Sequence, residues 1–343
     1  MRSILATLAL AAALISGGAL SAFADDPVVV RMTTMSPGGS RNGTMWFNPW
    51  AAKINEDAKG AIQVEVVEGY TLANLNNLYD RLMNDVVQIG WVIHPLIGGK
   101  FVLTEVAGLP FLADRSETLA VALWRLYKTG ALDKEYDDMM ALGLDVFAQS
   151  NLHYPKKPRT IDDLKGLKVS SSSRVQTLLI DKLEGAAVNL PPSDIYQSLL
   201  RGVVDASMTS WAAFAPFKLG EVTSFHIEAA FGASTNGFLM TRKKYASLPE
   251  AGRKAIDANS GEDIARRFGK FMDGEADFIR GPIAADTAHH TIVQLSPEQH
   301  AKWSARAKLV IDEWAASLPE RGPVLAKFRE ILAQVSSETR AGK

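Results

Sequence analysis

The sequence predicts two α/β lobes followed by a helical C-terminal segment. With 343 residues the chain is long enough for two domains, and its 47% of apolar residues can supply a core for each. Strand-like and helix-like patterns alternate from residue 28 to about residue 235, an order typical of βαβ units with mainly parallel sheets. From about Pro249 the patterns are helical. We therefore expect lobe 1 mainly over 25–148, lobe 2 mainly over 149–235, and a crossing strand with C-terminal helices that pack on both lobes over 236–343.

The first 24 residues have the three parts of a secretory signal peptide. A short start with one positive charge, Arg2, precedes an apolar stretch over 4–20, and the sequence AFA at 22–24 fits a small-x-small cleavage site. A membrane anchor is the alternative, although the apolar stretch is close to the lower length limit for a membrane span. We predict cleavage before Asp25, export of the chain, and a periplasmic location.

Each element of the predicted lobes follows from a local pattern. A short β-branched run at 28–33 predicts the first strand, and a helix at 43–58 follows a loop rich in Gly and Ser. Alternation at 62–67 predicts the second strand. By the same criteria we expect further strands at 86–93, 144–149 and 167–169, and further helices at 75–84, 116–129, 134–142, 298–317 and 323–336. A long helix is expected at 251–280, interrupted at most by its glycines.

Two helix-to-strand segments resemble each other. Residues 78–87 read LYDRLMNDVV and residues 195–204 read IYQSLLRGVV, with Tyr, Leu, Val and Val at the same offsets. A chance likeness between two such units is the alternative interpretation. Two lobes of similar design with facing strand ends would form a cleft, and ligands of open α/β sheets bind beyond the carboxyl ends of the strands.

Composition and missing motifs argue against several classes of function. A formal net charge of −1 provides no basic surface for nucleic acid, and the absence of cysteine excludes disulfides and thiolate metal sites. The sequence has no H-E-x-x-H, G-x-S-x-G, G-x-x-x-x-G-K or G-x-G-x-x-G pattern. We therefore expect no catalytic residues, no metal and no cofactor. An exported hydrolase remains the main rival class.

Five stretches, in order along the chain, resemble the solute-binding proteins of TRAP (tripartite ATP-independent periplasmic) transporters, the DctP-type family. The most specific of them is PSDIYQSLLRGVVD at 192–205. The resemblance implies a two-lobed periplasmic binding protein-like fold, with a ligand cleft between the lobes and a helical C-terminal segment. The other four stretches are GYTL at 69–72, EVAGLPF at 105–111, IDDLKGLKV at 161–169 and YASLP at 245–249.

The resemblance also implies a function and partners. Such a receptor captures a small organic solute, most often an organic acid, in the periplasm and delivers it to the membrane permease subunits of the transporter. We expect a monomer. Two alternatives stay open: the hydrolase, and a receptor of the same fold that passes an uncharged or aromatic solute to a chemosensory system.

The sequence departs from the family pattern at the position that matters most for an acidic solute. After the segment GLKV the family usually places an arginine that grips the carboxylate of the ligand, and this chain has Ser170 there. A serine hydroxyl offers one uncharged hydrogen bond, whereas arginine offers a charged bidentate fork. Arg174, expected in the first turn of the next helix, is the nearest substitute. A solvated helix residue is the alternative interpretation of Arg174.

Strand ends and the loops that follow them supply the candidate binding residues. They combine aromatic side chains with neutral polar groups, as small-molecule pockets do. For Trp91 and Phe231 a place in the core is the alternative, and for Asn151 and Asn236 a place in a turn. The complete candidate set is Tyr70, Trp91, Asn151, Ser170, Ser171, Arg174, Thr209, Trp211, Phe231 and Asn236.

Overall fold

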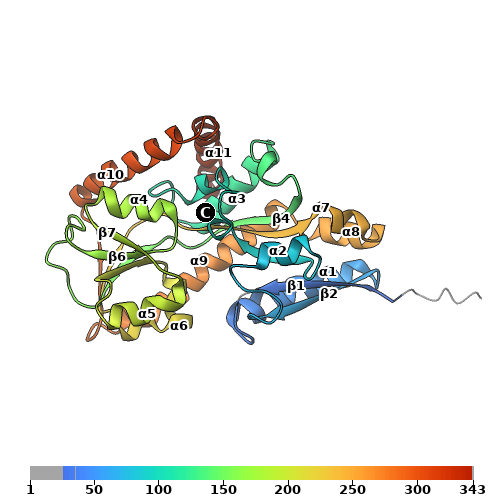
Figure 1. The fold of residues 1–343 in the computed structure, drawn as a ribbon, viewed down its shortest axis with the longest axis horizontal. Helices are drawn as coiled ribbons and strands as arrows, with labels where there is room; N and C mark the ends of the chain where they lie inside the picture. Colours follow the sequence, from blue (N-terminus) through green and yellow to red (C-terminus); the bar gives the residue numbers. More distant parts are fainter. Residues whose placement is uncertain (1–25, 35, 342–343) are drawn as a thin grey trace, which may run out of the picture.

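The chain forms two lobes that lie side by side, with the last two helices running along one side of the molecule (Figure 1). The computed structural model describes residues 26–34 and 36–341, so the signal peptide predicted for 1–24 lies outside the described residues. Within the described part, no helix is both long and apolar enough to cross a membrane. Each lobe is built on its own sheet, which confirms the predicted two-lobed α/β fold.

The first sheet has five strands in the order β2-β1-β3-β10-β4. The strands β1, β2 and β3 are parallel, and β10 runs antiparallel to both β3 and β4. The three parallel strands belong to successive βα units. The strand β10 follows most of the second sheet in the sequence and inserts between β3 and β4. The strands are β1 (Val28–Thr34), β2 (Ile62–Glu68), β3 (Ile89–Ile93), β4 (Met139–Val146) and β10 (Thr235–Thr241), and the helices are α1 (Asn48–Ala58), α2 (Leu78–Met83) and α3 (Ser116–Lys128).

The second sheet has six strands in the order β11-β9-β5-β8-β6-β7. The strand β6 is parallel to β7 and β8, and β9 is parallel to β11. Between these two groups β5 runs antiparallel to both β8 and β9. The strands are β5 (Asn151–Tyr154), β6 (Lys168–Ser171), β7 (Ala186–Asn189), β8 (Ala206–Thr209), β9 (Phe225–Glu228) and β11 (Thr291–Gln294), and the helices are α4 (Arg174–Lys182), α5 (Pro192–Leu200) and α6 (Phe214–Phe217).

Two of the segments that carry the chain between the sheets, residues 147–150 and 229–234, lie side by side. They are hydrogen-bonded to each other: the backbone N–H of Ser150 donates to the carbonyl oxygen of Gly232 at 2.9 Å, and that of Phe147 donates to Ser234 at 2.9 Å. The lobes are therefore joined by a paired double connection. The predicted lobe boundaries at 148 and 235 fall at this connection and remain a prediction.

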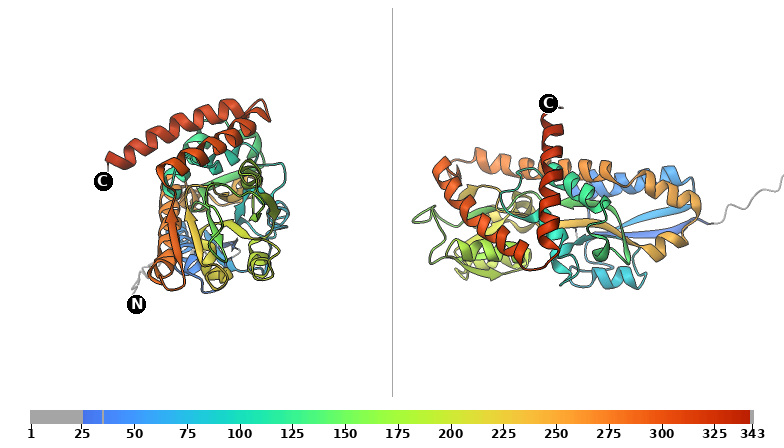
Figure 2. Two further views of the ribbon diagram at one scale, coloured as in Figure 1. Left: turned by 90° about the vertical axis from the view of Figure 1, so that its left-hand side faces the viewer. Right: turned by 90° about the horizontal axis from the view of Figure 1, so that it is seen from above.

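The helices after β10 cover both lobes. A long helix, α9 (Glu262–Ala285), packs against α3 and β4 of the first lobe and against the short turn Trp211–Ala213 of the second. The helix α10 (Pro297–Ala316) packs on α4, and α11 (Arg321–Ala341) packs on α3 (Figures 1 and 2). Two shorter helices, α7 (Arg242–Ser247) and α8 (Glu250–Ala258), precede α9.

One predicted helix is wrong, and another is interrupted at one of its glycines, as the sequence allowed. The segment 134–142 forms a single 3₁₀ turn (Asp133–Glu135) and then the first half of β4. Because both faces of β4 are buried, its residues are apolar without alternation. Such a run does not distinguish a strand from a helix. The helix predicted over 251–280 is broken between α8 and α9, where Gly261 adopts a φ of +98° that favours glycine.

Candidate functional site

Three neighbouring strands of the second sheet bring polar residues to the same side, where the ends of the strands form what we call the polar edge. Asn151 opens β5, Ser170 and Ser171 close β6, and Thr209 closes the strand β8 that lies between them. Asn151 and Thr209 are register partners, and the hydroxyl of Ser170 donates to that of Ser207 at 2.8 Å. The structure therefore gathers four of the predicted residues at the edge where a ligand of an α/β sheet is expected.

Asn151 lies in a strand, not in the polar loop that the sequence predicts. Its side-chain amide accepts a hydrogen bond from the backbone N–H of Ala229 at 3.3 Å and donates to the carbonyl oxygen of Gln149 at 3.3 Å. Because Gln149 and Ala229 belong to the two crossing segments, Asn151 ties both of them to the strand-end edge. A side-chain amide can make both contacts because it has one acceptor oxygen and one donor nitrogen.

A polar loop leads from β6 into α4. The side chain of Gln176 donates to Ser150 at 2.7 Å and accepts from the backbone N–H of Ser172 at 2.8 Å. Ser173 is the N-cap of α4, with its hydroxyl accepting from the backbone N–H of Gln176 at 3.2 Å. Gln176 was not singled out in the sequence, because its importance depends on the fold of this loop.

Arg174 is the first residue of α4, as predicted, and its side chain is exposed. It lies close enough to Glu105 for its charge to act on the pKa of that carboxyl group. Burial raises the pKa of Glu105, while a hydrogen bond from Trp314 and the charges of Arg321 and Arg174 lower it. Since Glu105 belongs to the first lobe and Arg174 to the second, Arg174 lies where the lobes meet. Among the described residues it forms no ion pair.

Trp91 and Asn236 meet at a buried carboxyl group of the first sheet. The indole Nε1 of Trp91 donates to Asp145 at 3.1 Å, and the amide Nδ2 of Asn236 donates to it at 2.9 Å. Asn236 lies inside β10 and not in a turn, and its Oδ1 has no hydrogen-bond partner among the described residues. Burial raises the pKa of Asp145 to about 7, against the opposing effect of the two hydrogen bonds. An acidic residue within a predicted strand was the signal that could have pointed to Asp145.

Replacing Asp145 with asparagine is expected to stabilise the protein at pH 8 but not at pH 4. The folded-state pKa is about 7 and the ordinary value is 3.8, so the native state binds more protons between these pH values and stability falls as pH rises through this window. The ionised form therefore lowers the free energy of unfolding by up to about 4 kcal/mol. Urea unfolding of Asp145→Asn and wild type at pH 4 and pH 8 measures the difference. Equal differences at both pH values would contradict the assignment.

Of the remaining aromatic candidates, Trp211 lies beside the polar edge, two residues after Thr209, but its side chain is buried. Trp211 is 4% exposed, and its Nε1 donates to Glu228 at 2.8 Å. Phe231 is fully buried and packs on Trp303 with ring centroids 5.0 Å apart. Tyr70 is 59% exposed in a turn after β2. Trp91 likewise lies in a cluster of aromatic rings in the first lobe. Their roles as ligand contacts remain predictions.

Comparison with known families assigns the chain. Residues 37–317 match the family described as bacterial extracellular solute-binding protein, family 7, also called DctP. The chain belongs to this family. Its members are binding proteins, and the family is extracytoplasmic, as the sequence motifs and the two-lobed fold imply.

Individual relatives agree with this assignment. The chain is 28% identical to the outer membrane transporter protein TsaT of Comamonas testosteroni over 279 residues, which are 80% of this chain and 82% of TsaT. A TRAP solute-binding protein of Rhodoferax ferrireducens, solved with copurified benzoate, is 27% identical with a TM-score of 0.82 over 91% of this chain and 99% of that one. A marine metagenome TRAP solute-binding protein specific for aromatic acids, solved with 3-hydroxybenzoate, is 26% identical with a TM-score of 0.83 over 90% and 99%.

Proposed function

We propose that this protein is the periplasmic receptor of a TRAP transporter for an aromatic carboxylate, which it binds where the two lobes meet and delivers to the membrane permease. It captures the solute unchanged and has no catalytic role. The observation that carries the proposal is the exposed guanidinium of Arg174, free of ion pairs in the described chain, beside a serine-rich strand edge.

The carboxylate of the solute is expected to bind at the N-terminus of α4. Arg174 provides a bidentate charged fork, and the first turn of the helix contains no acidic residue that would compete for it. The backbone N–H groups of a helix N-terminus favour an anion as well. Arg174 thus replaces the arginine that the family usually has at the position of Ser170, whose hydroxyl is already engaged with Ser207.

The aromatic character of the solute is supported by two relatives and one side chain. The relatives from Rhodoferax ferrireducens and the marine metagenome bind benzoate and 3-hydroxybenzoate. Phe147 in the first crossing segment is only partly buried, and its ring meets that of Trp91 edge to face with centroids 5.3 Å apart. A solute ring can stack on such a surface while its carboxylate reaches α4.

Thermal unfolding with paired solutes tests the proposal. Benzoate and 3-hydroxybenzoate, each at a hundred times its Kd, are expected to stabilise the chain without residues 1–24 by about 2.7 kcal/mol. Their neutral amides at equal concentration are expected to have no effect. Equal stabilisation by the amides would refute recognition of a carboxylate. If neither the acids nor their amides stabilise the protein, the proposal of an aromatic solute is refuted.

Substitution of Arg174 tests the position of the carboxylate. Arg174→Ala is expected to weaken benzoate binding more than tenfold, because a charged hydrogen bond contributes about 1.5–3 kcal/mol. Arg201→Ala is the matched control: Arg201 is an exposed arginine of the same lobe, at the C-terminus of α5, and benzoate affinity should be unchanged. Titration calorimetry measures both variants, and equal losses in the two would place the carboxylate elsewhere.

A further inference from the structure

Three histidines form a hydrogen-bonded chain through the second lobe. His153 of β5 and His226 of β9 are register partners, both with fully buried side chains, and their Nδ1 atoms lie 2.9 Å apart. The Nε2 atom of His226 lies 3.1 Å from Nδ1 of His290. At the other end, Nε2 of His153 lies 3.1 Å from the carbonyl oxygen of Thr209. The chain thus runs from the polar strand edge to His290.

The carbonyl oxygen of Thr209 fixes which ring nitrogen donates and which accepts at every step of the histidine chain. A carbonyl oxygen only accepts, so Nε2 of His153 carries the proton and its Nδ1 accepts from Nδ1–H of His226. The Nε2 atom of His226 then accepts from Nδ1–H of His290. Burial lowers the pKa of both inner histidines, which are neutral at pH 7. Among the six ring nitrogens of these three histidines, Nε2 of His290 is therefore the one that can take up a proton without breaking a hydrogen bond of the histidine chain.

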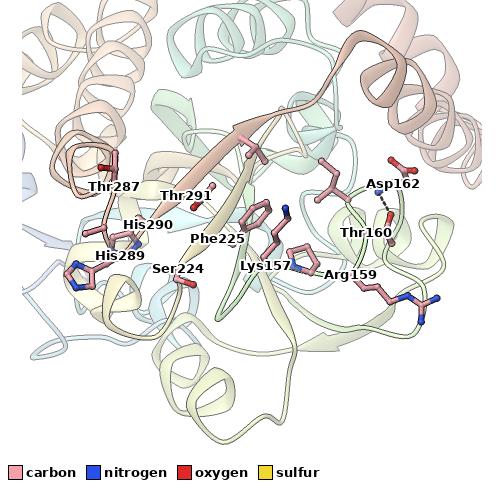
Figure 3. A pocket seen from close by; sticks show the side chains of 14 residues that line it. Lys157, Arg159, Thr160, Asp162, Ser224, Phe225, Thr287, His289, His290 and Thr291 are labelled. Atoms are coloured by element: carbon pink, nitrogen blue, oxygen red, sulfur yellow. Dashed lines mark hydrogen bonds between the residues drawn. The ribbon is translucent and has the colours of Figure 1, made fainter.

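His290 lines a pocket of about 600 Å³ at the outer end of the chain (Figure 3). Phe225 provides an apolar wall, and Figure 3 shows the side chain of Lys157 beside it. The hydroxyls of Thr287 and Thr291 also line the pocket and make no hydrogen bond to another described residue. The volume falls in the range of sites for small organic ligands.

The charges around the pocket favour an anion. Lys157 and Arg159 are exposed and form no ion pair within the described chain, although Arg159 extends away from the other labelled side chains. Asp162 is the one acidic side chain among the described lining residues, and it accepts a hydrogen bond from a glutamine of α10 at 3.0 Å. His289 is paired with Asp286 at 2.9 Å. Within the described residues the lining thus has two unpaired cations, Lys157 and Arg159, against the one unpaired carboxylate of Asp162, and its excess charge is positive.

We propose that this pocket is a second binding site, for a small organic oxyanion, which His290 holds as an imidazolium. On binding, Nε2 of His290 takes a proton from solvent and keeps it, and this Nε2–H donates a hydrogen bond to the anion while Nδ1–H continues to donate to His226. Lys157 supplies the second charged contact, and Phe225 packs on the apolar part of the ligand. The inference does not depend on the identity of the transported solute.

The pocket is separate from the proposed solute site. The strand β5 begins at Asn151, which pairs with Thr209 at the polar edge, and ends at Tyr154, which pairs with Phe225 of the pocket. The two sites thus lie at opposite ends of a strand about 10 Å long. None of the predicted solute-site residues lines the pocket.

Nitrogen NMR of the ¹⁵N-histidine-labelled protein tests the proposal with phenyl phosphate and inorganic phosphate as probes. Before addition, His153 is expected as the Nε2–H tautomer, with His226 and His290 as Nδ1–H tautomers. At pH 7, phenyl phosphate should shift the signals of His290 saturably toward the imidazolium position. Its Kd should be lower than that of inorganic phosphate because its ring packs on Phe225. Absence of a saturable shift, or reversed tautomers, would overturn the proposal.

Matched variants locate the site. Lys157→Ala is expected to weaken phenyl phosphate binding about tenfold, as for a lost charged hydrogen bond. Lys156→Ala, at the adjacent exposed lysine outside the pocket, and Arg174→Ala, at the solute site, should leave it unchanged. His290→Asn keeps a donor for His226 but has no ring to protonate, so it should retain the inner signals and lose proton uptake. Equal effects of the two lysine variants would refute the assignment.

Discussion

Replacing Gly232 with alanine is expected to lower the free energy of unfolding by about 3 kcal/mol. Gly232 has a φ of +90°, and an added Cβ atom would lie 2.6 Å from the carbonyl oxygen of Gly108. A side chain is strained in the left-handed region by about 1–2 kcal/mol, and overpacking against fixed atoms adds about 1–3 kcal/mol. The neighbouring atoms are backbone atoms of Gly108 and Pro110, in the segment that packs against the second crossing segment, so they have little freedom to move aside.

Gly108 lies on the other side of the same contact and is expected to respond similarly. Its added Cβ atom would overlap the carbonyl oxygen of Ala233, whose N–H donates to the carbonyl oxygen of Gly108 at 3.1 Å. Gly274→Ala is the control: this glycine lies inside α9 with no atom within 4 Å of an added Cβ, and the change should stabilise by up to about 1 kcal/mol. Urea unfolding measures the three variants. Wild-type stability of both Gly232→Ala and Gly108→Ala would show that the connection is not closely packed.

Most elements of the fold could be predicted because their patterns are local. The strand at 28–33 is marked by a short β-branched run and the strand at 62–67 by an alternation with a period of two, and a single sequence displays both. The segment 134–142 could not be assigned in this way, because burial of both faces of β4 by α3 and α9 removes the alternation. The break before α9 depends on one backbone conformation, at Gly261, which no periodic pattern records.

The candidate site could be predicted only in part. The polar strand ends at Ser170 and Thr209 follow from the order of strands, and the position of Arg174 in the first turn of α4 follows from the serine run before it. The direction of the aromatic side chains could not be predicted. Trp211 follows a strand end, yet its ring lies against His153 with centroids 4.7 Å apart, because three elements of the second lobe enclose it.

The histidine chain was not visible in the sequence for the same reason. His153 and His226 are 73 residues apart, and His290 is 64 residues further along. Only the pairing of β5 with β9, and of β9 with β11, brings the three rings together. Contacts that depend on register between distant strands require the folded structure.

His226 is expected to destabilise the protein as pH falls from about 6.5 to about 3, in opposition to the stabilisation that protonation of Asp145 provides as pH falls from about 7. Burial lowers the pKa of His226 from 6.5 to about 3 in the folded state. Between these values the unfolded state binds a proton that the native state does not bind, so the free energy of unfolding falls as pH falls. At 1.36 kcal/mol per pKa unit the loss is about 5 kcal/mol. His153, whose pKa is lowered as well, contributes in the same direction.

His226→Gln separates this effect from the titration of carboxyl groups. The variant breaks the histidine chain, so we expect it to be about 2 kcal/mol less stable than wild type at pH 7. It has no imidazole at this position, however, so its free energy of unfolding relative to that of wild type should rise as pH falls from 6.5 to 4. His300→Gln, at an exposed histidine of α10, should keep the wild-type slope. Urea midpoints across this pH range measure the slopes, and a wild-type slope in His226→Gln would show that the buried chain does not control acid stability.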